Sequence, residues 1–303
     1  MSRTTPARVE GHTIELSNLD KVLYPAVGFT KGQVVDYYSR VAPAILPHLK
    51  DHPLTMKRYP DGVEGEYFYE KECPFFHPDW VDTATMESRN VRGSVSFCVL
   101  NGQAPLVWVA NLASLELHVL LSKRQDLGRP TAVAFDLDPG EGSDILTACR
   151  AALKLRDLLD EMGLRSFAKC SGGKGMHVYV PLNTKTDFEA TKAFAHAVAS
   201  MMEKREPDLV TSNMRKDLRK GKILVDWSQN DIHKTTVCVY SLRAREHPTV
   251  STPLEWKEVE QGLKKEDPSL VLFESDRVLE RIEKHGDLFA EVLTLKQKLP
   301  QVS

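Results

Sequence analysis

The sequence predicts a mixed α and β (α+β) fold, and two sets of segments support that prediction. Short apolar runs at 132–138 and 223–226 have the composition of buried strands, and both contain carboxylates at their ends. Longer segments at 31–48, 144–162 and 186–204 place apolar residues at helical intervals. The chain shows no internal repeat and no low-complexity linker, so we expect one domain.

The composition is that of an ordinary globular protein. The 303 residues suffice for a substantial core, and 42% of them are hydrophobic and 27% charged. No apolar run approaches about 18 residues and the first residues carry no apolar signal core, so the cytoplasm is the expected location and no membrane contact is expected. The formal charge of -2 argues against nonspecific coating of nucleic acid. Nucleic-acid binding would require locally grouped basic residues.

The five cysteines are widely spread and include no Cys-x-x-Cys pair. An odd number with such spacing is typical of reduced, buried side chains. We therefore expect neither a disulfide framework nor a zinc site.

The central strand at 132–138 carries Asp136 and Asp138 just before Pro139-Gly140. Side chains alternate along a strand, so both carboxylates point the same way, about 6.6 Å apart, with Leu137 behind them. Paired acids of this kind ligate divalent metals, and a two-metal site with ions about 3.5–4 Å apart suits nucleotidyl or phosphoryl transfer. A strand that leads into a turn is the alternative.

Thr30 and Gln33 have the spacing of a capping box, and the predicted helix at 31–48 therefore begins at Lys31. Backbone N–H groups are free at a helix start, so Lys31 with Lys21 and Asn18 has the chemistry to cradle an anion. A solvated lysine at a helix start is the alternative.

Aromatic residues lie among charges at 54–71, where a strand containing Lys57 and Arg58 is followed by Tyr67-Phe68-Tyr69. Bases stack on rings and phosphates bind cations, so this mixture suits a nucleic acid, although aromatic runs also form cores. Residues 73–93 are expected to form an irregular loop, followed by strands at 94–100 and 106–110.

The segment Leu115-Glu116-Leu117-His118-Val119 alternates apolar and polar residues, which predicts a strand with Glu116 and His118 on one face. A single histidine in such a strand is usually structural. Its function therefore depends on what lies around it.

Ser171-Gly172-Gly173-Lys174-Gly175-Met176-His177 follows the predicted strand at 166–170. Three glycines around a lysine let backbone N–H groups approach phosphate oxygens, while Lys174 and Ser171 add a charge and a donor. The spacing of a Walker loop is absent. The segment predicts a phosphate-binding hairpin, with a simple glycine-rich turn as the alternative.

Residues 211–222 form a basic run, and the strand after it ends in a third carboxylate, Asp226. Such a run suits a nucleic-acid backbone or a solvated surface. Lys234 precedes another predicted strand at 235–240, and Arg243 follows it. Arginine binds phosphate with two parallel hydrogen bonds. If these strands share one sheet, the three aspartates, the hairpin and Arg243 form one site.

These blocks together closely resemble the polymerase domain of bacterial ligase D, the end-joining branch of the archaeo-eukaryotic primase superfamily. The matching blocks span nearly the whole chain in the family's order and are Leu19 to Pro25, Lys57-Arg58, Phe135 to Gly140, Ser171 to His177, Val225 to Asn230 and Tyr240 to Arg243. The resemblance implies a primase-polymerase fold of mostly antiparallel or mixed catalytic sheets flanked by helices. It also implies one domain over 1–303, with a DNA-end-binding part at about 1–125 and a catalytic part at about 126–303.

The resemblance assigns roles to individual residues. Asp136, Asp138 and Asp226 would ligate two divalent ions, with Asp226 nearest the primer 3′ hydroxyl. The triphosphate of the incoming nucleotide would be held by Ser171, Lys174, His177, Lys234 and Arg243. His118 would lie near the nucleotide sugar or the primer terminus, with Phe68 or Tyr69 stacked on base or template. The DNA contacts would be Asn18, Lys21 and Lys31 at a 5′ phosphate, Lys57 and Arg58 along the template, and Arg219 at the primer end or a second DNA end.

The implied activity is template-dependent, and also template-independent, nucleotide addition to primer 3′ ends at gaps and double-strand breaks in non-homologous end joining. The resemblance further implies Mn²⁺ or Mg²⁺, nucleoside triphosphates with a preference for ribonucleotides, and Ku and a DNA ligase as partners in a bacterial or archaeal cytosol near the nucleoid. Two rival functions stay open, an Asp-x-Asp phosphohydrolase with Asp136 as nucleophile and a noncatalytic module that bridges DNA ends.

Overall fold

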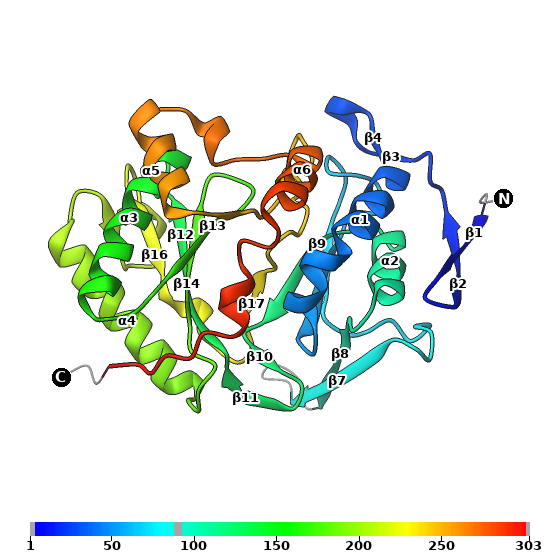
Figure 1. The fold of residues 1–303 in the computed structure, drawn as a ribbon, viewed down its shortest axis with the longest axis horizontal. Helices are drawn as coiled ribbons and strands as arrows, with labels where there is room; N and C mark the ends of the chain where they lie inside the picture. The colour runs from blue at the N-terminus through cyan, green and yellow to red at the C-terminus, as the bar shows by residue number, and fades with distance from the viewer. Residues whose placement is uncertain (1–3, 88–92, 301–303) are drawn as a thin grey trace. The chain divides into compact units, whose positions relative to one another are not determined.

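The computed structural model of the chain describes residues 4–87 and 93–300, which form two compact units (Figure 1). The first unit comprises Met1–Gln125, Thr235–Val250 and Glu274–Gly286, and the second comprises Asp126–Lys234, Ser251–Phe273 and Asp287–Ser303. The first change of unit therefore falls near residue 125. Two later stretches return to the first unit, so the expected catalytic part at 126–303 is not one continuous piece.

The first unit is built on an antiparallel sheet with strand order β17-β9-β5-β8-β7, in which β6 also pairs with β5. The strands are β5 (Pro53–Arg58), β6 (Phe68–Glu70), β7 (Asp82–Glu87), β8 (Ser94–Val99), β9 (Ser114–Leu120) and β17 (Thr235–Val237), with two hairpins formed by β1 (Thr4–Val9) and β2 (His12–Ser17) and by β3 (Val22–Tyr24) and β4 (Phe29–Thr30). The helices are α1 (Lys31–Leu49), α2 (Gln103–Asn111) and α6 (Ser275–His285). The Tyr38 hydroxyl donates to the Leu115 carbonyl at 2.8 Å and so ties α1 to the sheet.

The second unit is built on a sheet with strand order β15-β16-β12-β14-β13-β18, antiparallel except between β15 and β16. Its strands are β12 (Ala132–Pro139), β13 (Phe167–Cys170), β14 (Met176–Pro181), β15 (Val210–Thr211), β16 (Ile223–Asp226) and β18 (Pro253–Leu254). Its helices are α3 (Ile145–Glu161), α4 (Phe188–Arg205) and α5 (Trp256–Lys265). The short strands β10 (Ser122–Lys123) and β11 (Asp126–Pro130) lie where the chain passes from the first unit to the second.

The core of the second unit lies between the sheet and its helices, and α3 and α4 lie together along one side of the sheet in Figure 1. Val133, Phe135 and Leu137 of β12 are fully buried in this core. Because strand side chains alternate, Asp136 and Asp138 face the opposite side. The alternation that buries Val133, Phe135 and Leu137 therefore also places the two carboxylates on the face away from this core.

The predicted mixed α and β fold is confirmed, and several elements end where the sequence predicts. The predicted helices at 31–48 and 144–162 are α1 and α3. The cap of α3 is Asp144, whose carboxylate accepts from the Thr147 N–H at 2.8 Å. The cap of α4 is likewise an aspartate, Asp187, whose carboxylate accepts from the Ala190 N–H at 2.8 Å.

Three local predictions are wrong. The segment 106–110 belongs to helix α2, not to a strand. The expected irregular loop at 73–93 contains strand β7, and residues 88–92 of that loop lie outside the described part of the chain. The expected set of reduced cysteines is also wrong, because Cys73 and Cys98 form a disulfide with a Cα–Cα distance of 4.8 Å. Cys149, Cys170 and Cys238 are buried and take no part in a disulfide.

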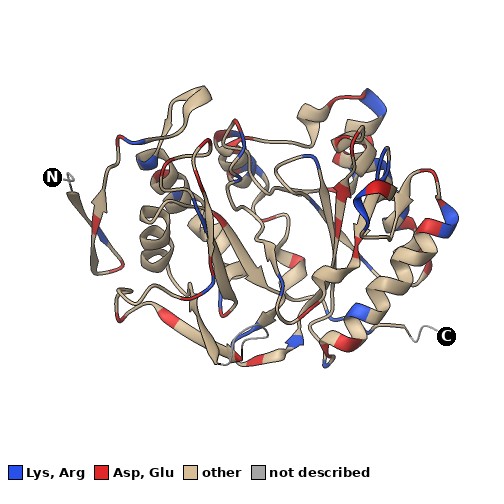
Figure 2. Cartoon of the chain, turned by 180° about the vertical axis from the view of Figure 1, so that it is seen from behind, with Lys and Arg blue, Asp and Glu red and all other residues tan. Residues whose placement is uncertain are grey.

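Charged residues of both signs are interspersed in each unit (Figure 2). This distribution accords with the formal charge of -2. Among the described residues, none of the helices is both long and apolar enough to span a membrane.

Candidate active site

Four chemically active side chains occupy one row across the sheet of the second unit. Asp226 of β16 is the direct partner of Asp136 of β12, Asp136 is the partner of His177 of β14, and His177 is the partner of Lys169 of β13. Direct partners in antiparallel strands have Cβ atoms about 4.5–5.5 Å apart on the same face. The row therefore reads carboxylate, carboxylate, imidazole, ammonium.

The two carboxylates of this row are held by neighbouring groups. The His177 Nε2 lies 3.4 Å from Asp136 Oδ1. Asp226 Oδ1 accepts from the Ser228 N–H at 2.8 Å and from its hydroxyl at 2.6 Å, and Oδ2 accepts from the Gln229 amide at 2.9 Å. Lys234 Nζ in turn donates to Ser228 Oγ. The turn after β16 therefore fixes the third aspartate and brings Lys234 to it.

The glycine-rich hairpin is confirmed as a structure, because β13 and β14 are antiparallel neighbours joined by residues 171–175. The Ser171 N–H donates to the Gly175 carbonyl at 2.9 Å and closes the turn, and Lys174 is exposed at its tip. A Cβ at Gly175 would lie 2.8 Å from the Leu137 carbonyl oxygen. Only glycine lets this hairpin pack against the strand of the two aspartates.

The basic run is anchored beside Asp138. The Gly140 N–H donates to the Lys222 carbonyl at 2.8 Å, and a Cβ at Gly140 would lie 1.8 Å from the Arg219 carbonyl oxygen. The Arg219 guanidinium lies 3.9 Å from Asp138 Oδ2 and donates to the Met214 carbonyl at 2.5 Å. Glycine at 140 therefore permits the approach that places Arg219 next to the carboxylates.

The donor set fits divalent cations. Among residues 4–87 and 93–300, no three His, Cys, Asp or Glu side chains are already gathered as a metal site. Asp136 and Asp226 nevertheless stand directly opposite on neighbouring strands, and like charges in that arrangement destabilise a sheet. A hard cation bound by carboxylate oxygens would relieve this repulsion. Asp138, on the same face of β12 with 62% of its side chain exposed, is a further oxygen ligand.

In the first unit a buried carboxylate, Glu116, gathers several of the predicted residues. Its Oε2 lies 2.9 Å from His118 Nε2 and 3.3 Å from Arg243 Nε, and its Oε1 lies 3.8 Å from Lys57 Nζ. Burial alone would raise the pKa of Glu116, but the hydrogen bond to His118 and the charge of Arg243 hold it well below its usual range. Burial lowers the pKa of His118 against the opposing effect of Glu116.

Aromatic rings surround the Lys57 side of this cluster. The Lys57 ammonium lies 4.1 Å from the Tyr67 ring centroid and 5.4 Å from that of Tyr69, and burial lowers its pKa. Tyr69 is 55% exposed and its ring meets His118 edge-on with 6.0 Å between centroids. Phe68 is 44% exposed with the Arg58 guanidinium 5.2 Å from its centroid. Exposed rings beside cations are the chemistry that stacks bases and binds phosphates.

The backbone N–H groups at the start of α1, which were expected to bind an anion, already have hydrogen-bond partners. The N–H groups of Lys31 and Gly32 donate to the Lys21 and Leu19 carbonyls, both at 2.8 Å, and Gln33 donates to Thr30 Oγ1. The expectation of free N–H groups is therefore wrong. Asn18, in the left-handed region at φ 54, turns the chain so that Lys21 lies beside Lys31.

Cationic side chains instead lie together at the start of α1, namely Lys31, Lys21 and Arg58. Lys31 is 6% exposed, and its ammonium donates to the Ser17 carbonyl at 2.6 Å and to the Ser17 hydroxyl at 3.1 Å. Burial, and then the charges of Lys21 and Arg58, lower the pKa of Lys31 to about 8. Lys21 itself pairs with Asp61 at 2.7 Å. Three cations that repel one another form a site that an anion would stabilise.

The structure divides the predicted site residues between the units. Asp136, Asp138, Ser171, Lys174, His177, Arg219, Asp226 and Lys234 lie in the second, and Asn18, Lys21, Lys31, Lys57, Arg58, Phe68, Tyr69, His118 and Arg243 lie in the first. The expectation that Arg243 follows a strand of the aspartate sheet is wrong, since β17 pairs with β9 instead. Sequence reasoning missed Glu116 and Lys169, although each has the period-two spacing of its strand.

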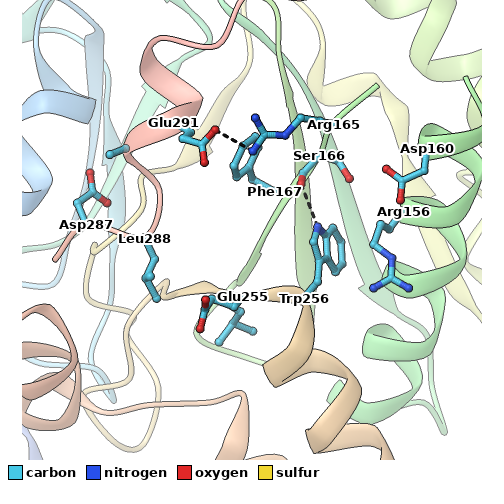
Figure 3. Close-up of a pocket in the computed structure, with 12 residues that line it drawn as sticks. Arg156, Asp160, Arg165, Ser166, Phe167, Glu255, Trp256, Asp287, Leu288 and Glu291 are labelled. Atoms are coloured by element: carbon cyan, nitrogen blue, oxygen red, sulfur yellow. Dashed lines mark hydrogen bonds and ion pairs between the residues drawn. The ribbon is translucent and has the colours of Figure 1, made fainter. Parts of the chain in front are cut away.

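A separate cavity of about 480 Å³ opens at the start of β13 in the second unit (Figure 3). Arg165 projects into it and pairs with Glu291 at 2.8 Å, and the Trp256 indole donates to the Ser166 carbonyl at 2.9 Å. None of the predicted site residues lines it. The cavity is therefore distinct from the carboxylate row.

Comparison with known proteins identifies the family to which the chain is similar. The family described as LigD, primase-polymerase domain, matches residues 30–289. The multifunctional non-homologous end joining protein LigD of Mycolicibacterium smegmatis is 41% identical over 279 residues, which cover 91% of this chain and 36% of that protein. The bifunctional LigD of Bacillus subtilis is 33% identical over 95% of this chain and 45% of its own length. The chain thus spans less than half the length of these curated relatives.

A solved structure gives the same result at the level of the fold. The polymerase domain of Mycobacterium tuberculosis ligase D, in complex with DNA, superposes with a TM-score of 0.85 at 39% identity, over 94% of this chain and 99% of that one. The chain therefore belongs to the family of LigD primase-polymerase domains and is a nucleotidyltransferase of the polymerase class.

Proposed function

We propose that this protein adds nucleotides to primer 3′ ends at gaps and double-strand breaks during non-homologous end joining. The observation that carries the proposal is the pair Asp136 and Asp226, directly opposed on β12 and β16 beside the glycine-rich hairpin. An opposed carboxylate pair lowers the stability of a sheet, so its presence argues for a ligand. The relatives' names supply the end-joining context, and the solved relative's complex supports DNA as the substrate.

In this proposal Asp136, Asp138 and Asp226 hold two divalent cations, Mn²⁺ or Mg²⁺. When bound, such ions make the primer hydroxyl a better nucleophile and neutralise charge on the triphosphate. The chain's own groups bind and orient the substrates. Ser228 and Gln229 hold Asp226 at a fixed orientation.

The triphosphate is held by donors from the hairpin and its surroundings. Lys174 and Ser171 supply an ammonium and a hydroxyl, His177 lies against Asp136, and Lys234 is brought in by Ser228. Arg243, which lies in the first unit, is proposed as a further phosphate contact. Positioning and electrostatic stabilisation account for most of the catalysis of such transfers.

The remaining predicted residues are proposed to bind DNA and the sugar. His118 contacts the nucleotide sugar or the primer terminus, and Phe68 or Tyr69 stacks on base or template. The 5′ phosphate is bound by Asn18, Lys21 and Lys31, the template by Lys57 and Arg58, and the primer end or a second DNA end by Arg219. We further propose a preference for ribonucleotides, template-independent as well as templated addition, and Ku and a DNA ligase as partners.

Primer extension on gapped DNA tests the proposal. With Mn²⁺ and a ribonucleotide or deoxyribonucleotide triphosphate, the wild type should lengthen the primer. The variant Asp136→Ala/Asp138→Ala should lose extension and retain DNA, because Arg219 alone of the proposed DNA contacts lies beside these aspartates. Inorganic phosphate released without extension would identify a phosphohydrolase instead, and DNA retention without extension by the wild type would identify a bridging module.

A further inference from the structure

Glu116 is a buried charge that the assignments above do not use. Its side chain is 2% exposed, and it lies on β9 two residues before His118, with both side chains on the same face of the strand. We propose that Glu116 is a positioning residue for nucleotide addition, which fixes the protonated nitrogen of His118 and the orientation of Arg243. This inference rests on the proposed function.

Two hydrogen-bond donors and two cations surround the two oxygens of this carboxylate. Oε2 is shared by His118 Nε2 at 2.9 Å and Arg243 Nε at 3.3 Å. Oε1 accepts from the Ala244 N–H at 3.1 Å and lies 3.8 Å from Lys57 Nζ. Arg243 and Ala244 come from a stretch more than a hundred residues after β9, so the carboxylate also joins a loop to the strand. Such a set fixes the side chains around it in one geometry.

The contact with Glu116 decides which nitrogen of His118 carries the proton. An ionised carboxylate only accepts hydrogen bonds, so Nε2 of His118 must donate. A neutral imidazole has one N–H, and its other nitrogen, here Nδ1, is then an acceptor. Low pKa values for both groups support an ionised Glu116 beside a neutral ring. His118 would therefore offer Nδ1 to a hydroxyl donor on a bound nucleotide or primer.

The charges around Glu116 make its own charge necessary. Lys57 and Arg243 are both within 4 Å of it, Arg245 lies close enough to lower the pKa of Lys57, and the nearby Tyr59 and Tyr69 stay neutral because burial and Glu116 raise their pKa values. Without the carboxylate, two half-buried cations would lie near each other without this counter-charge. Cations released from a common partner lose their fixed positions.

Nitrogen-15 NMR of histidine-labelled full chain tests the inference without relying on activity. The His118 signal, assigned by its loss in His118→Gln, should show the Nε2–H form in the wild type. In Glu116→Gln the same signal should shift toward a mixture of both forms, because an amide can donate as well as accept. A wild-type ring with the proton on Nδ1 would overturn the inference.

Steady-state kinetics of primer extension give the second readout. Glu116→Gln should lower kcat about 10- to 100-fold, the effect of losing one hydrogen bond to a charged group. In a His118→Ala background the decrease in kcat caused by Glu116→Gln should be at least about fivefold smaller, because Glu116 acts through His118. Glu116→Asp, which keeps the charge, should recover part of the rate. Equal costs in both backgrounds would show a merely structural role and refute the inference.

Asp51→Asn is the matched control, since Asp51 is a carboxylate of the same unit that pairs with Arg124 and accepts from Asn101. It should leave kcat and the His118 signal unchanged. A wild type without extension would refute the proposed function, and the inference with it. An active wild type with a fully active Glu116→Gln would refute the inference alone.

Discussion

Raising the pH from 7 to 9 should remove most of the affinity that a DNA 5′ phosphate contributes to binding. Lys31 is the cause, because burial and the charges of Lys21 and Arg58 lower its pKa to about 8. An ordinary lysine keeps its proton to about pH 10.4. Lys31 therefore loses its charge within a pH range in which a lysine of ordinary pKa stays charged.

The size of the effect follows from the charged fraction of Lys31. With a pKa of about 8, that fraction falls from about 0.9 at pH 7 to about 0.1 at pH 9. A bound phosphate dianion favours the charged form and so raises the pKa of Lys31, which means that binding takes up a proton above pH 8. Affinity for the phosphate must then fall as the pH rises, by about tenfold over the two units.

Fluorescence anisotropy at constant ionic strength measures this. Gapped DNA with a 5′ phosphate is compared with the same DNA ending in a hydroxyl, and the ratio of the two affinities isolates the phosphate. The phosphate's own second pKa is about 6, so it stays a dianion throughout. Lys31→Arg is the matched control, because arginine keeps its charge at every pH used.

The ratio should fall about tenfold in the wild type and stay constant in Lys31→Arg. A wild-type ratio that does not change between pH 7 and 9 would show that the phosphate binds elsewhere. An equal fall in both proteins would show that some other group titrates. In Lys21→Ala/Lys31→Ala the two affinities should be equal. The slope of log affinity against log salt concentration should become less steep by about one unit per lost contact.

Three further predictions follow from the geometry of the second unit and from the cysteines. Gly140→Ala should lower the unfolding free energy by about 1–3 kcal/mol and impair primer extension, because the added Cβ would lie 1.8 Å from the Arg219 carbonyl oxygen. Thermal melts and extension assays check this, and an unchanged melting temperature would contradict it. Ser228→Ala removes a 2.6 Å hydrogen bond to Asp226 and should lower kcat about tenfold with little change in DNA affinity; a wild-type rate would show that Asp226 is held without it. Alkylation of the denatured, unreduced protein should label three cysteines and spare the Cys73–Cys98 pair, as read by mass spectrometry; five labels would refute the disulfide.

Periodicity in the sequence predicts elements well where one face is buried and the other is not. The helices α1 and α3 show that contrast, and both lie where the pattern places them. The helix α2 lacks it, because residues 104–110 are all buried. A short apolar run without a polar face has no period, so periodicity could not distinguish a helix from a strand at 106–110.

The composition of the candidate site was easier to predict than its arrangement. Each aspartate can be recognised from its own strand, but the direct pairing of Asp136 with Asp226 depends on β16 lying next to β12. The partners of Glu116 come from three separate stretches of the chain. A local pattern shows which face a residue occupies, whereas burial of a charge depends on partners that only the tertiary fold supplies.

The places where this sequence breaks local rules are the places where chemistry is proposed. An opposed carboxylate pair at Asp136 and Asp226 weakens strand pairing, and the glycines at 140 and 175 lose more conformational entropy than any other residue would. None of these choices stabilises the sheet by itself. They bring a hairpin, a basic loop and three acids close together on the face of the sheet away from α3 and α4, so the cost in stability is best explained by a ligand whose charge the acids require.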